Sequence, residues 1–513
     1  MSRRLALALA FALLAALGAV FVVHGRFNID EGMHLHAGRL IYEQGRLPYR
    51  DFPFSQGPAG PFLYGAAGAL FGTSLLVGRC VSLALNLVGV AALARVAALF
   101  SGLPGALLVV GFTLVNFPAL WTFSQVRSEP PAIALAGLAV LAWFQRRGSV
   151  VRWALAPALL VWATAFRLTY GLPLLVTCAL TAHELRRSPR RLAWVAVLVL
   201  ANGLLAAWPL LVAPDQSLFH VVTSQLDRAE RLGWSHLPFS ARFWFFAMSD
   251  RGFWPILLAS GLPLLYVALR WREGFRPRGF RCDDPALAVL ALFGMAVCSF
   301  APTLLFRSGF FQYFVNASLL LVTAVAIALP LLVRRGGRVR RASVAVASCA
   351  GIAAAWLAIA HVDTFLDPGE STVWRLRGLR ERVERIAPAG CTMLTFETHL
   401  AVELGCDVTR GLEYSYFSFF RELPDAEARE RGVLNRKLLL RELRTMQPEF
   451  VALSREDVER ITGIKAPARR PPRLPGMAGR YMPMARLELP VLLLLTTHAE
   501  LYVYARADLL PAS

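Results

Sequence analysis

Long apolar runs separated by short arginine-rich loops are the feature that most constrains the fold of this chain. A helix needs about twenty apolar residues to cross a bilayer, and windows of that kind recur along residues 1–361. With 56% hydrophobic residues and a mean hydropathy of +0.51, the chain is too apolar for a soluble protein of its length. The sequence predicts a polytopic α-helical membrane protein with about eleven transmembrane helices. They are expected near residues 5–23, 75–99, 104–121, 131–145, 150–166, 169–183, 192–212, 252–270, 285–305, 313–333 and 342–361.

The basic residues predict the orientation of these spans. The formal net charge is +20, but most of the arginines lie in short loops rather than on a soluble domain, so a nucleic-acid partner is not expected. The basic loops alternate along the chain so that they share one face with the N-terminus, which the positive-inside rule makes cytoplasmic. An odd number of spans then places everything after residue 361 on the opposite face.

The loop after the first span, residues 24–74, is neither a simple connection nor a clean span. Residues 30–42 have helical character, and residues 57–72 are apolar but short and rich in glycine. Both segments are predicted to be helices at the membrane interface, one amphipathic and one half-inserted.

Residues 362–513 differ in composition from the rest of the chain. Acidic residues and prolines increase and the apolar runs shorten, which predicts a small α/β domain outside the membrane. Strands are expected at 391–396, 448–454, 481–489 and 500–506, a further buried strand at 489–495, and a helix within 421–446. Cys391 and Cys406 would pair if this domain faces an oxidising compartment; otherwise they are two buried thiols.

Two adjacent acids, Asp30 and Glu31, follow the first span. Carboxylates near hydrocarbon are costly, so such a pair suggests a functional site. Asp30 is the candidate general base, and Glu31 could orient it or raise its pKa. The alternative is that both acids stabilise the positive end of the helix that begins there. Asp51 is a second candidate acid, unless it only pairs with Arg50 in its loop.

Three arginines, Arg127, Arg167 and Arg307, each end a predicted span on the face that carries Asp30. Arginine suits phosphate recognition because its guanidinium donates two parallel hydrogen bonds. Isolated arginines at span ends also snorkel to the interface, and Glu129 could pair with Arg127 instead. Candidate sugar-binding residues nearby are Tyr170, Gln312 and Tyr313, although aromatic residues are also common interfacial anchors.

Metal and cofactor binding are not expected. The seven cysteines form no CxxC or Cys/His ligand pattern. His34 and His36 are two residues apart and would point to different faces of a helix, so they are poorly placed to share an ion.

The first hundred residues resemble a known family. An Asp-Glu pair after the first span is followed by GRLIYEQGRLPYRDF, a half-inserted helix rich in Gly and Pro, and the span LFGTSLLVGRCVSLALNLVGVAALARVAALF. This order is similar to that of the GT-C superfamily of membrane glycosyltransferases, and most similar to its branch of protein O-mannosyltransferases and aminoarabinose transferases. The span count and the C-terminal domain resemble the family more loosely.

The resemblance implies an inverting, metal-independent transfer from a polyprenyl-phosphate-linked sugar on the periplasmic side of a bacterial inner membrane. It assigns the acidic motif of the first outer loop to Asp30, with Glu31 beside it. Where the aminoarabinose branch has Glu-Lys-Pro-Pro, this chain has Ser55, Gln56, Gly57 and Pro58. The substitution removes an acid and a lysine, which argues against lipid A modification and leaves Asp51 as the nearest substitute acid.

The predicted function is therefore transfer of a sugar from a polyprenyl phosphate to an envelope glycan, lipid or protein. A transporter or flippase would also use an arginine-lined outer cavity, but the chain lacks the paired halves usual in such proteins. A non-catalytic membrane scaffold would not need acids and arginines on one face. The identities of the sugar and the acceptor depend on pocket contacts rather than on these motifs.

Overall fold

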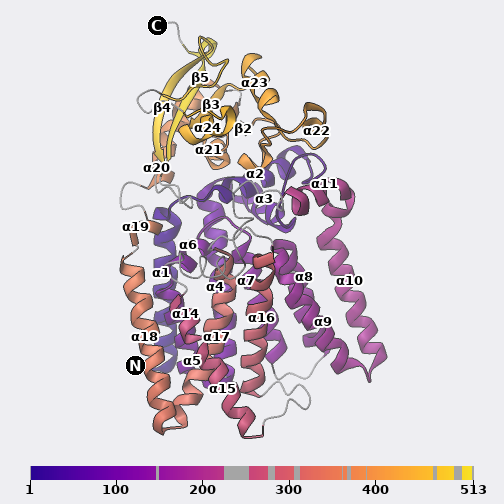
Figure 1. Ribbon diagram of the computed structural model, residues 1–513, viewed down its shortest axis with the longest axis vertical. Helices are drawn as coiled ribbons and strands as arrows, with labels where there is room; N and C mark the ends of the chain where they lie inside the picture. The colour runs from indigo at the N-terminus through magenta and orange to yellow at the C-terminus, as the bar shows by residue number, and fades with distance from the viewer. Residues whose placement is uncertain are drawn as a thin grey trace.

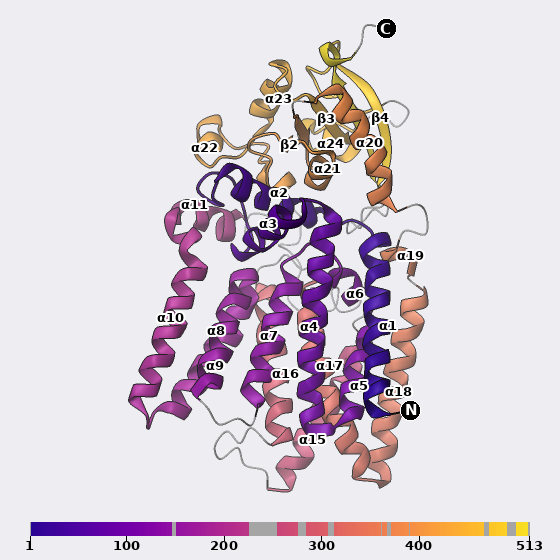
Figure 2. The same cartoon turned by 180° about the vertical axis from the view of Figure 1, so that it is seen from behind.

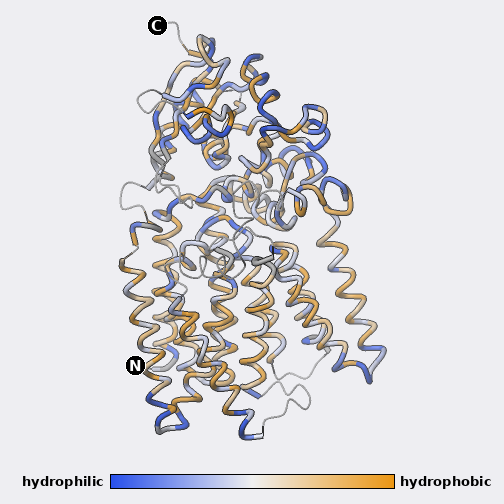
Figure 3. Tube along the Cα trace, viewed as in Figure 1, coloured by the Kyte–Doolittle hydropathy of each residue, from blue (hydrophilic) through white to orange (hydrophobic). Residues whose placement is uncertain are grey.

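The computed structural model consists of a helical bundle with a small mixed sheet at one end (Figure 1). It describes residues 2–145, 150–224, 254–274, 284–305, 312–360, 362–366, 371–388, 390–465, 471–489 and 499–510. The first helix begins at the end of the bundle away from the sheet (Figure 1), so the start of this helix and the C-terminal sheet lie at opposite ends of the molecule. Apolar residues dominate the bundle, whereas the C-terminal region has mixed polarity (Figure 3).

All eleven segments expected to span the membrane are helical in the described residues. Six helices are long and apolar enough to cross a bilayer, or seven if one bent pair counts as a single span; several of the others are shorter apolar helices. Helix length alone therefore does not establish a count of eleven. The bundle helices are α1 (Arg3–His24), α4 (Leu75–Ser101), α5 (Leu103–Leu114), α6 (Phe117–Phe123), α7 (Glu129–Phe144), α8 (Val150–Phe166), α9 (Gly171–Leu185), α10 (Pro189–Val212), α14 (Trp254–Ala259), α15 (Gly261–Arg272), α16 (Pro285–Leu305), α17 (Gln312–Arg334) and α18 (Gly337–Ala360).

The segment expected as one span at 104–121 is instead a bent pair, α5 and α6, at an angle of 81°. The Asn116 side chain accepts a hydrogen bond from the backbone N–H of Ala119, and Pro118 occupies the first turn of α6. An N-cap followed by proline starts a new helix rather than continuing the old one. After this bent pair, the backbone N–H of Val126 donates to Glu31 and Nη2 of Arg127 donates to Asp30.

Two short helices lie between the bundle and the sheet, where the sequence predicts interfacial helices (Figure 2). They are α2 (Ile29–Gln44) and α3 (Ala59–Phe71). A capping box between Asn28 and Glu31 starts α2, and Gly45 ends it with a φ of 65°. The two helices touch through glycine, because a Cβ on Gly38 would lie 2.6 Å from the Cα of Gly65.

The C-terminal region forms a five-stranded sheet in the order β2-β1-β3-β5-β4. The strands are β1 (Thr392–Thr395), β2 (Asp407–Val408), β3 (Phe450–Ser454), β4 (Tyr481–Leu489) and β5 (Ala499–Arg506). Four of the strand predictions are confirmed, β2 was not anticipated, and the strand proposed at 489–495 lies outside the described residues except for Leu489, which ends β4. Helices α20 (Thr372–Ile386), α21 (Thr398–Leu404), α22 (Asp425–Glu430), α23 (Arg436–Arg444) and α24 (Arg455–Thr462) complete this region.

Cys391 and Cys406 are joined by a disulfide, with their Cα atoms 4.6 Å apart. The bond links the residue before β1 to the residue before β2, two strands that pair in parallel. The pairing that the sequence left open is therefore the one observed. Disulfides persist in oxidising compartments.

The C-terminal region packs on the bundle through α21, which lies against α2. Gly32 of α2 is at the point of closest approach: a Cβ there would lie 1.9 Å from the backbone nitrogen of His399. Phe27, just before α2, stacks on the His399 ring with centroids 4.7 Å apart. The helix that carries Asp30 is thus held on one side by the bundle and on the other by α21.

This close approach makes Gly32 sensitive to any side chain. We expect Gly32→Ala to destabilise the protein by about 1–3 kcal/mol, because the methyl group would meet backbone atoms that cannot move aside cheaply. Thermal unfolding of the detergent-solubilised protein measures the effect. Gly378→Ala in α20 is the matched control, since nothing lies within 4 Å of its Cβ; it should be neutral or slightly stabilising. Equal unfolding temperatures for both variants would contradict the prediction.

Candidate active site

Asp30 and Glu31 are adjacent in the first turn of α2 but occupy different environments. The Asp30 side chain is 13% exposed and accepts a hydrogen bond from Nη2 of Arg127, with an N–O distance of 2.8 Å. The Glu31 side chain is completely buried. Of these two acids, Asp30 is therefore the one with exposed surface.

Glu31 is held by four hydrogen bonds. Nε and Nη2 of Arg79 donate to its two oxygens, each at 2.7 Å. The backbone N–H groups of Val126 and Asn28 donate to the same carboxylate at 3.2 and 3.1 Å. With its oxygens occupied in this way, Glu31 ties α2 to the bundle, which is the capping role that the sequence left as an alternative.

Arg79 is a residue that the sequence reasoning missed. It lies in α4, has no exposed surface, and also donates from Nη1 to the backbone oxygens of Val22 and Gly25 at 2.9 and 3.0 Å. A buried guanidinium inside an apolar span is costly unless it is paired. A single arginine near the start of the span LLVGRC was the signal that could have identified it.

A second ion-pair network continues from Asp30. Arg127 contacts Asp30 and also places Nε 3.2 Å from an oxygen of Glu129. Arg167 places Nη1 2.7 Å from the other Glu129 oxygen. Two guanidinium groups from different parts of the chain thus share the Glu129 carboxylate, next to the exposed edge of Asp30.

The fold positions these arginines at one end of the bundle. Arg127 follows the bent pair α5–α6, Glu129 begins α7, and Arg167 follows α8. The Tyr64 hydroxyl of α3 donates to the backbone oxygen of Arg127 at 2.6 Å, and so fixes the loop that carries it. Two of the three predicted arginines are therefore brought together beside Asp30.

The remaining predicted residues are placed less completely. Tyr170 ends a short 3-10 helix (Leu168–Tyr170) and is buried, and its hydroxyl has no hydrogen-bond partner among the described residues. Arg307 lies outside the described residues. Gln312 and Tyr313 begin α17, but only their backbone is described.

Asp51 is engaged in its own loop. Nη2 of Arg50 lies 2.7 Å from one carboxylate oxygen, and the backbone N–H of Leu47 donates to the same oxygen at 2.7 Å. The hydrogen bond from Arg50 lowers the pKa of Asp51. Asp51 makes no ion pair or hydrogen bond with the Asp30 network within the part of the chain that the structure describes, so its observed contact is the local pairing with Arg50.

His34 and His36 are buried in the part of the chain that the structure describes. Nε2 of His34 lies 3.1 Å from the side-chain oxygen of Gln56, and burial lowers the pKa of His34 to about 4. Burial likewise lowers the pKa of His36 to about 3. Among the described residues, no group of three or more His, Cys, Asp or Glu side chains could hold an ion.

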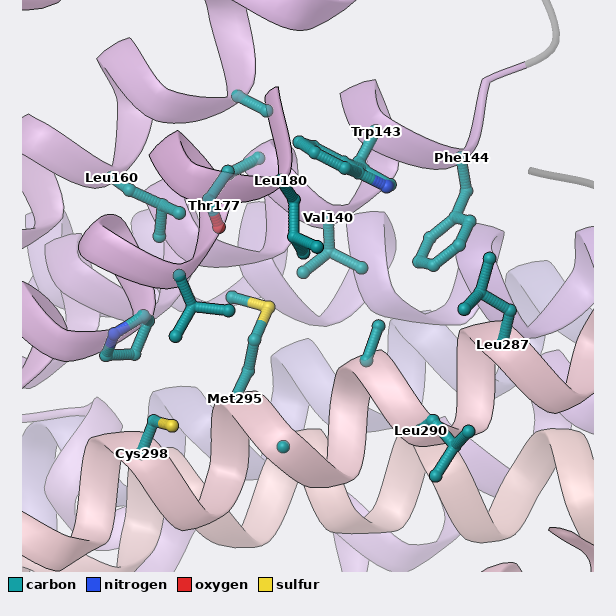
Figure 4. A pocket seen from close by; sticks show the side chains of 16 residues that line it. Val140, Trp143, Phe144, Leu160, Thr177, Leu180, Leu287, Leu290, Met295 and Cys298 are labelled. Atoms are coloured by element: carbon teal, nitrogen blue, oxygen red, sulfur yellow. The ribbon is translucent and has the colours of Figure 1, made fainter. Parts of the chain in front are cut away.

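An apolar cavity of about 250 Å³ lies further along α7, which begins at Glu129, and α8, which Arg167 follows (Figure 4). Its walls come from α7, α8, α9 and α16, and Thr177 contributes one of its few polar atoms. Figure 4 shows Trp143, Leu160, Leu180 and Met295 around the space. Such a lining fits hydrocarbon and offers nothing to a charged group.

Comparisons with known proteins give a fold but no close sequence relative. No family model matches the chain, and no curated protein matches it in sequence. The structure is similar to that of ArnT from Cupriavidus metallidurans in the apo state, with a TM-score of 0.55 and 15% identity over 100% of both chains. ArnT from the same organism bound to undecaprenyl phosphate matches with a TM-score of 0.52 and 15% identity, over 99% of this chain and 98% of that one.

A third similar structure is the oligosaccharyltransferase of Archaeoglobus fulgidus, crystallised with Zn and sulfate. It matches with a TM-score of 0.50 and 14% identity over 90% of this chain and 68% of its own. ArnT, which is an aminoarabinose transferase, and the oligosaccharyltransferase are both members of the GT-C superfamily. The chain therefore has the GT-C fold that its first hundred residues resemble.

Proposed function

We propose that this protein is an inverting glycosyltransferase that uses a polyprenyl-phosphate-linked sugar. The observation that carries the proposal is the Asp30–Arg127 contact, in which an accessible carboxylate meets a guanidinium at one end of a GT-C fold. Sugar transfer from a lipid phosphate needs a base for the acceptor and positive charge for the departing phosphate. This corner supplies both within hydrogen-bond distance of each other.

Asp30 acts as the base in this mechanism. The acceptor hydroxyl or amine attacks the anomeric carbon and its proton passes to Asp30. The bond between that carbon and the phosphate oxygen breaks, and polyprenyl phosphate leaves with the bonding electrons. Attack from the side opposite the phosphate inverts the configuration at the anomeric carbon.

Arg127 and Arg167 hold the phosphate. In the structure Arg127 donates a hydrogen bond to the Asp30 carboxylate. A donor phosphate competes for the same guanidinium and so releases Asp30 for proton transfer. Glu129 keeps both arginines in place, since it contacts each of them.

The other candidate residues take supporting roles in the proposal. Glu31 positions Asp30 through the Arg79 pair, and Tyr170 offers its buried hydroxyl to the sugar or phosphate. Arg307, Gln312 and Tyr313 are assigned to the donor as well, on the basis of the sequence. Asp51 remains a second acid to test, and no metal or cofactor is assigned.

The proposed location is a bacterial inner membrane, with the N-terminus cytoplasmic. Residues 1–361 form the transferase module and residues 362–513 a periplasmic domain that helps to hold an envelope acceptor, which is a glycan, a lipid or a protein. The Cys391–Cys406 disulfide supports an oxidising compartment for this domain. The apolar cavity supports a ligand with a hydrocarbon chain.

A turnover assay tests this proposal. Purified protein is incubated with a panel of polyprenyl-phosphate sugars and crude envelope acceptors, and release of polyprenyl phosphate is measured. Release that requires both donor and acceptor is expected. If protein in vesicles moved a labelled lipid-linked sugar across the bilayer without releasing polyprenyl phosphate, the protein would be a flippase.

Replacing Arg167 should weaken donor binding more than it weakens the fold. We expect Arg167→Gln to raise the Kd for polyprenyl phosphate by about 10- to 100-fold, because a charge-assisted hydrogen bond contributes about 1.5–3 kcal/mol. Binding of a fluorescent polyprenyl phosphate to protein in micelles measures this. Arg167→Lys keeps the charge and should bind with intermediate affinity; the exposed Arg410→Gln is the neutral control. Unchanged affinity in Arg167→Gln would remove Arg167 from the donor site.

A further inference from the structure

A second pocket, with a polar lining, lies in the C-terminal region between the loop before α22 and the helix α23. Its volume is about 370 Å³, within the range of about 300–1,000 Å³ usual for small-molecule sites. We call it the α23 pocket. It is lined by Arg421, Glu422, Leu423, Asp425, Asn435, Arg436, Lys437, Leu440 and Arg444.

The two acidic residues of the α23 pocket already have cationic partners. Asp425 lies 3.2 Å from Nζ of Lys437 and accepts a hydrogen bond from the Asn435 amide at 2.9 Å; these bonds lower the pKa of Asp425. Glu422 lies 3.1 Å from Nε of Arg421. Four cationic and two acidic side chains leave the lining with an excess of positive charge.

Arg436 and Arg444 carry this excess. Neither makes an ion pair or a side-chain hydrogen bond among the residues that the structure describes, although both belong to α23 and line the same pocket. Guanidinium groups recognise phosphate and carboxylate through paired N–H donors. Two guanidinium groups that line the same pocket form a binding site for an anion.

The start of α23 adds to this preference. The helix begins with Arg436 and Lys437, and its first turn contains no acidic residue. The N-terminus of a helix carries partial positive charge, so cations there are unfavourable and an anion is favoured. A bound anion would offset this repulsion.

The position of the α23 pocket separates it from the Asp30 corner. In Figures 1 and 2, α23 lies toward the end of the C-terminal region that is away from the bundle, whereas α2 lies between the sheet and the bundle. A pocket so placed does not face the bilayer with which the bundle is in contact. Its ligand is therefore a group outside the membrane rather than a lipid headgroup.

We propose that the α23 pocket binds the phosphate or carboxylate of an anionic saccharide. Arg436 and Arg444 bind the anion, and the acceptor oxygens of Asp425 and Glu422 bind sugar hydroxyls. The combination of cationic and acidic side chains in the lining selects the kind of ligand. The carboxylates repel a densely charged polyanion, but they suit a molecule with one anionic group and several hydroxyls. The site does not depend on the transferase function: saccharide binding and sugar transfer can fail separately.

Binding of small saccharides to the full-length protein in micelles tests the proposal. The probes are glucose 1-phosphate, glucuronate and uncharged glucose, titrated with calorimetric detection. Saturable binding of at least one anionic probe is expected, and the Kd should rise with salt because the contact is ionic. If glucose 1-phosphate has the lower Kd, the ligand class is a phosphorylated saccharide. If glucuronate has the lower Kd, the ligand class is a uronate.

Two double variants complete the experiment. Arg436→Gln with Arg444→Gln should raise the Kd for the anionic probe at least about tenfold, given the strength of charge-assisted hydrogen bonds. Arg377→Gln with Arg382→Gln removes two exposed arginines of α20 and should change nothing. Thermal unfolding checks that all proteins are folded. The proposal is overturned if neither anionic probe binds below about 10 mM, a Kd too weak to indicate a specific site, if glucose binds equally well, or if both double variants bind like the parent.

Discussion

Replacing Asp30 by asparagine should lower the rate of sugar transfer by about 10²- to 10⁴-fold, the usual contribution of a general base. Asparagine keeps the size of the side chain and an oxygen that accepts the hydrogen bond from Arg127, so the fold should be retained. The change removes only the ability to take up a proton at neutral pH. Turnover of the purified protein, compared at equal donor occupancy, measures the effect.

Asp51→Asn is the matched control for this prediction. Asp51 pairs with the half-exposed Arg50, and exposed ion pairs contribute at most about 1 kcal/mol to stability. We expect its turnover to stay within a few fold of the parent. Normal turnover in a properly inserted Asp30→Asn protein would rule out Asp30 as the base, and a large loss in Asp51→Asn would move that role to Asp51.

Breaking the Glu31–Arg79 pair should have the largest effect on stability. Both side chains are completely buried and share two hydrogen bonds of 2.7 Å. Removing one partner of a buried ion pair leaves a buried charge without compensation, which costs about 3–5 kcal/mol. We therefore expect Glu31→Gln and Arg79→Met each to lower the unfolding temperature sharply.

The double variant Glu31→Gln with Arg79→Met separates the charge effect from packing. It removes both charges, while the single glutamine oxygen can still accept one of the two hydrogen bonds that Val126 and Asn28 donate to separate oxygens of Glu31. Its stability should recover part of the loss seen in the single variants, because neither charge remains buried alone. If the loss of stability in the double variant equals the sum of the losses in the two single variants, the two side chains are not coupled. Arg50→Gln, at an exposed pair, should change the unfolding temperature little.

Much of the architecture could be predicted from local patterns. The eleven apolar windows all fall on segments that are helical in the described residues, and the strand patterns located β1, β3, β4 and β5, because hydropathy is a property of consecutive residues. Strand β2 escaped prediction, since it has only two residues and forms by pairing with β1. The bend between α5 and α6 was missed because the apolar run continues across Asn116 and Pro118, although these residues start a new helix.

Sequence by itself therefore determined that this chain is a multi-helix membrane protein with a small α/β region, and singled out Asp30, Arg127 and Arg167. Only the tertiary structure decided which partner and which environment each of the two adjacent acids, Asp30 and Glu31, has. Glu31 pairs with Arg79, 48 positions along the chain, whereas Asp30 pairs with Arg127, 97 positions away. The cause is that neighbouring residues on a helix point in different directions, so their partners depend on which helices pack beside α2. Packing, and not the adjacency of the two acids, buries Glu31 and leaves Asp30 accessible.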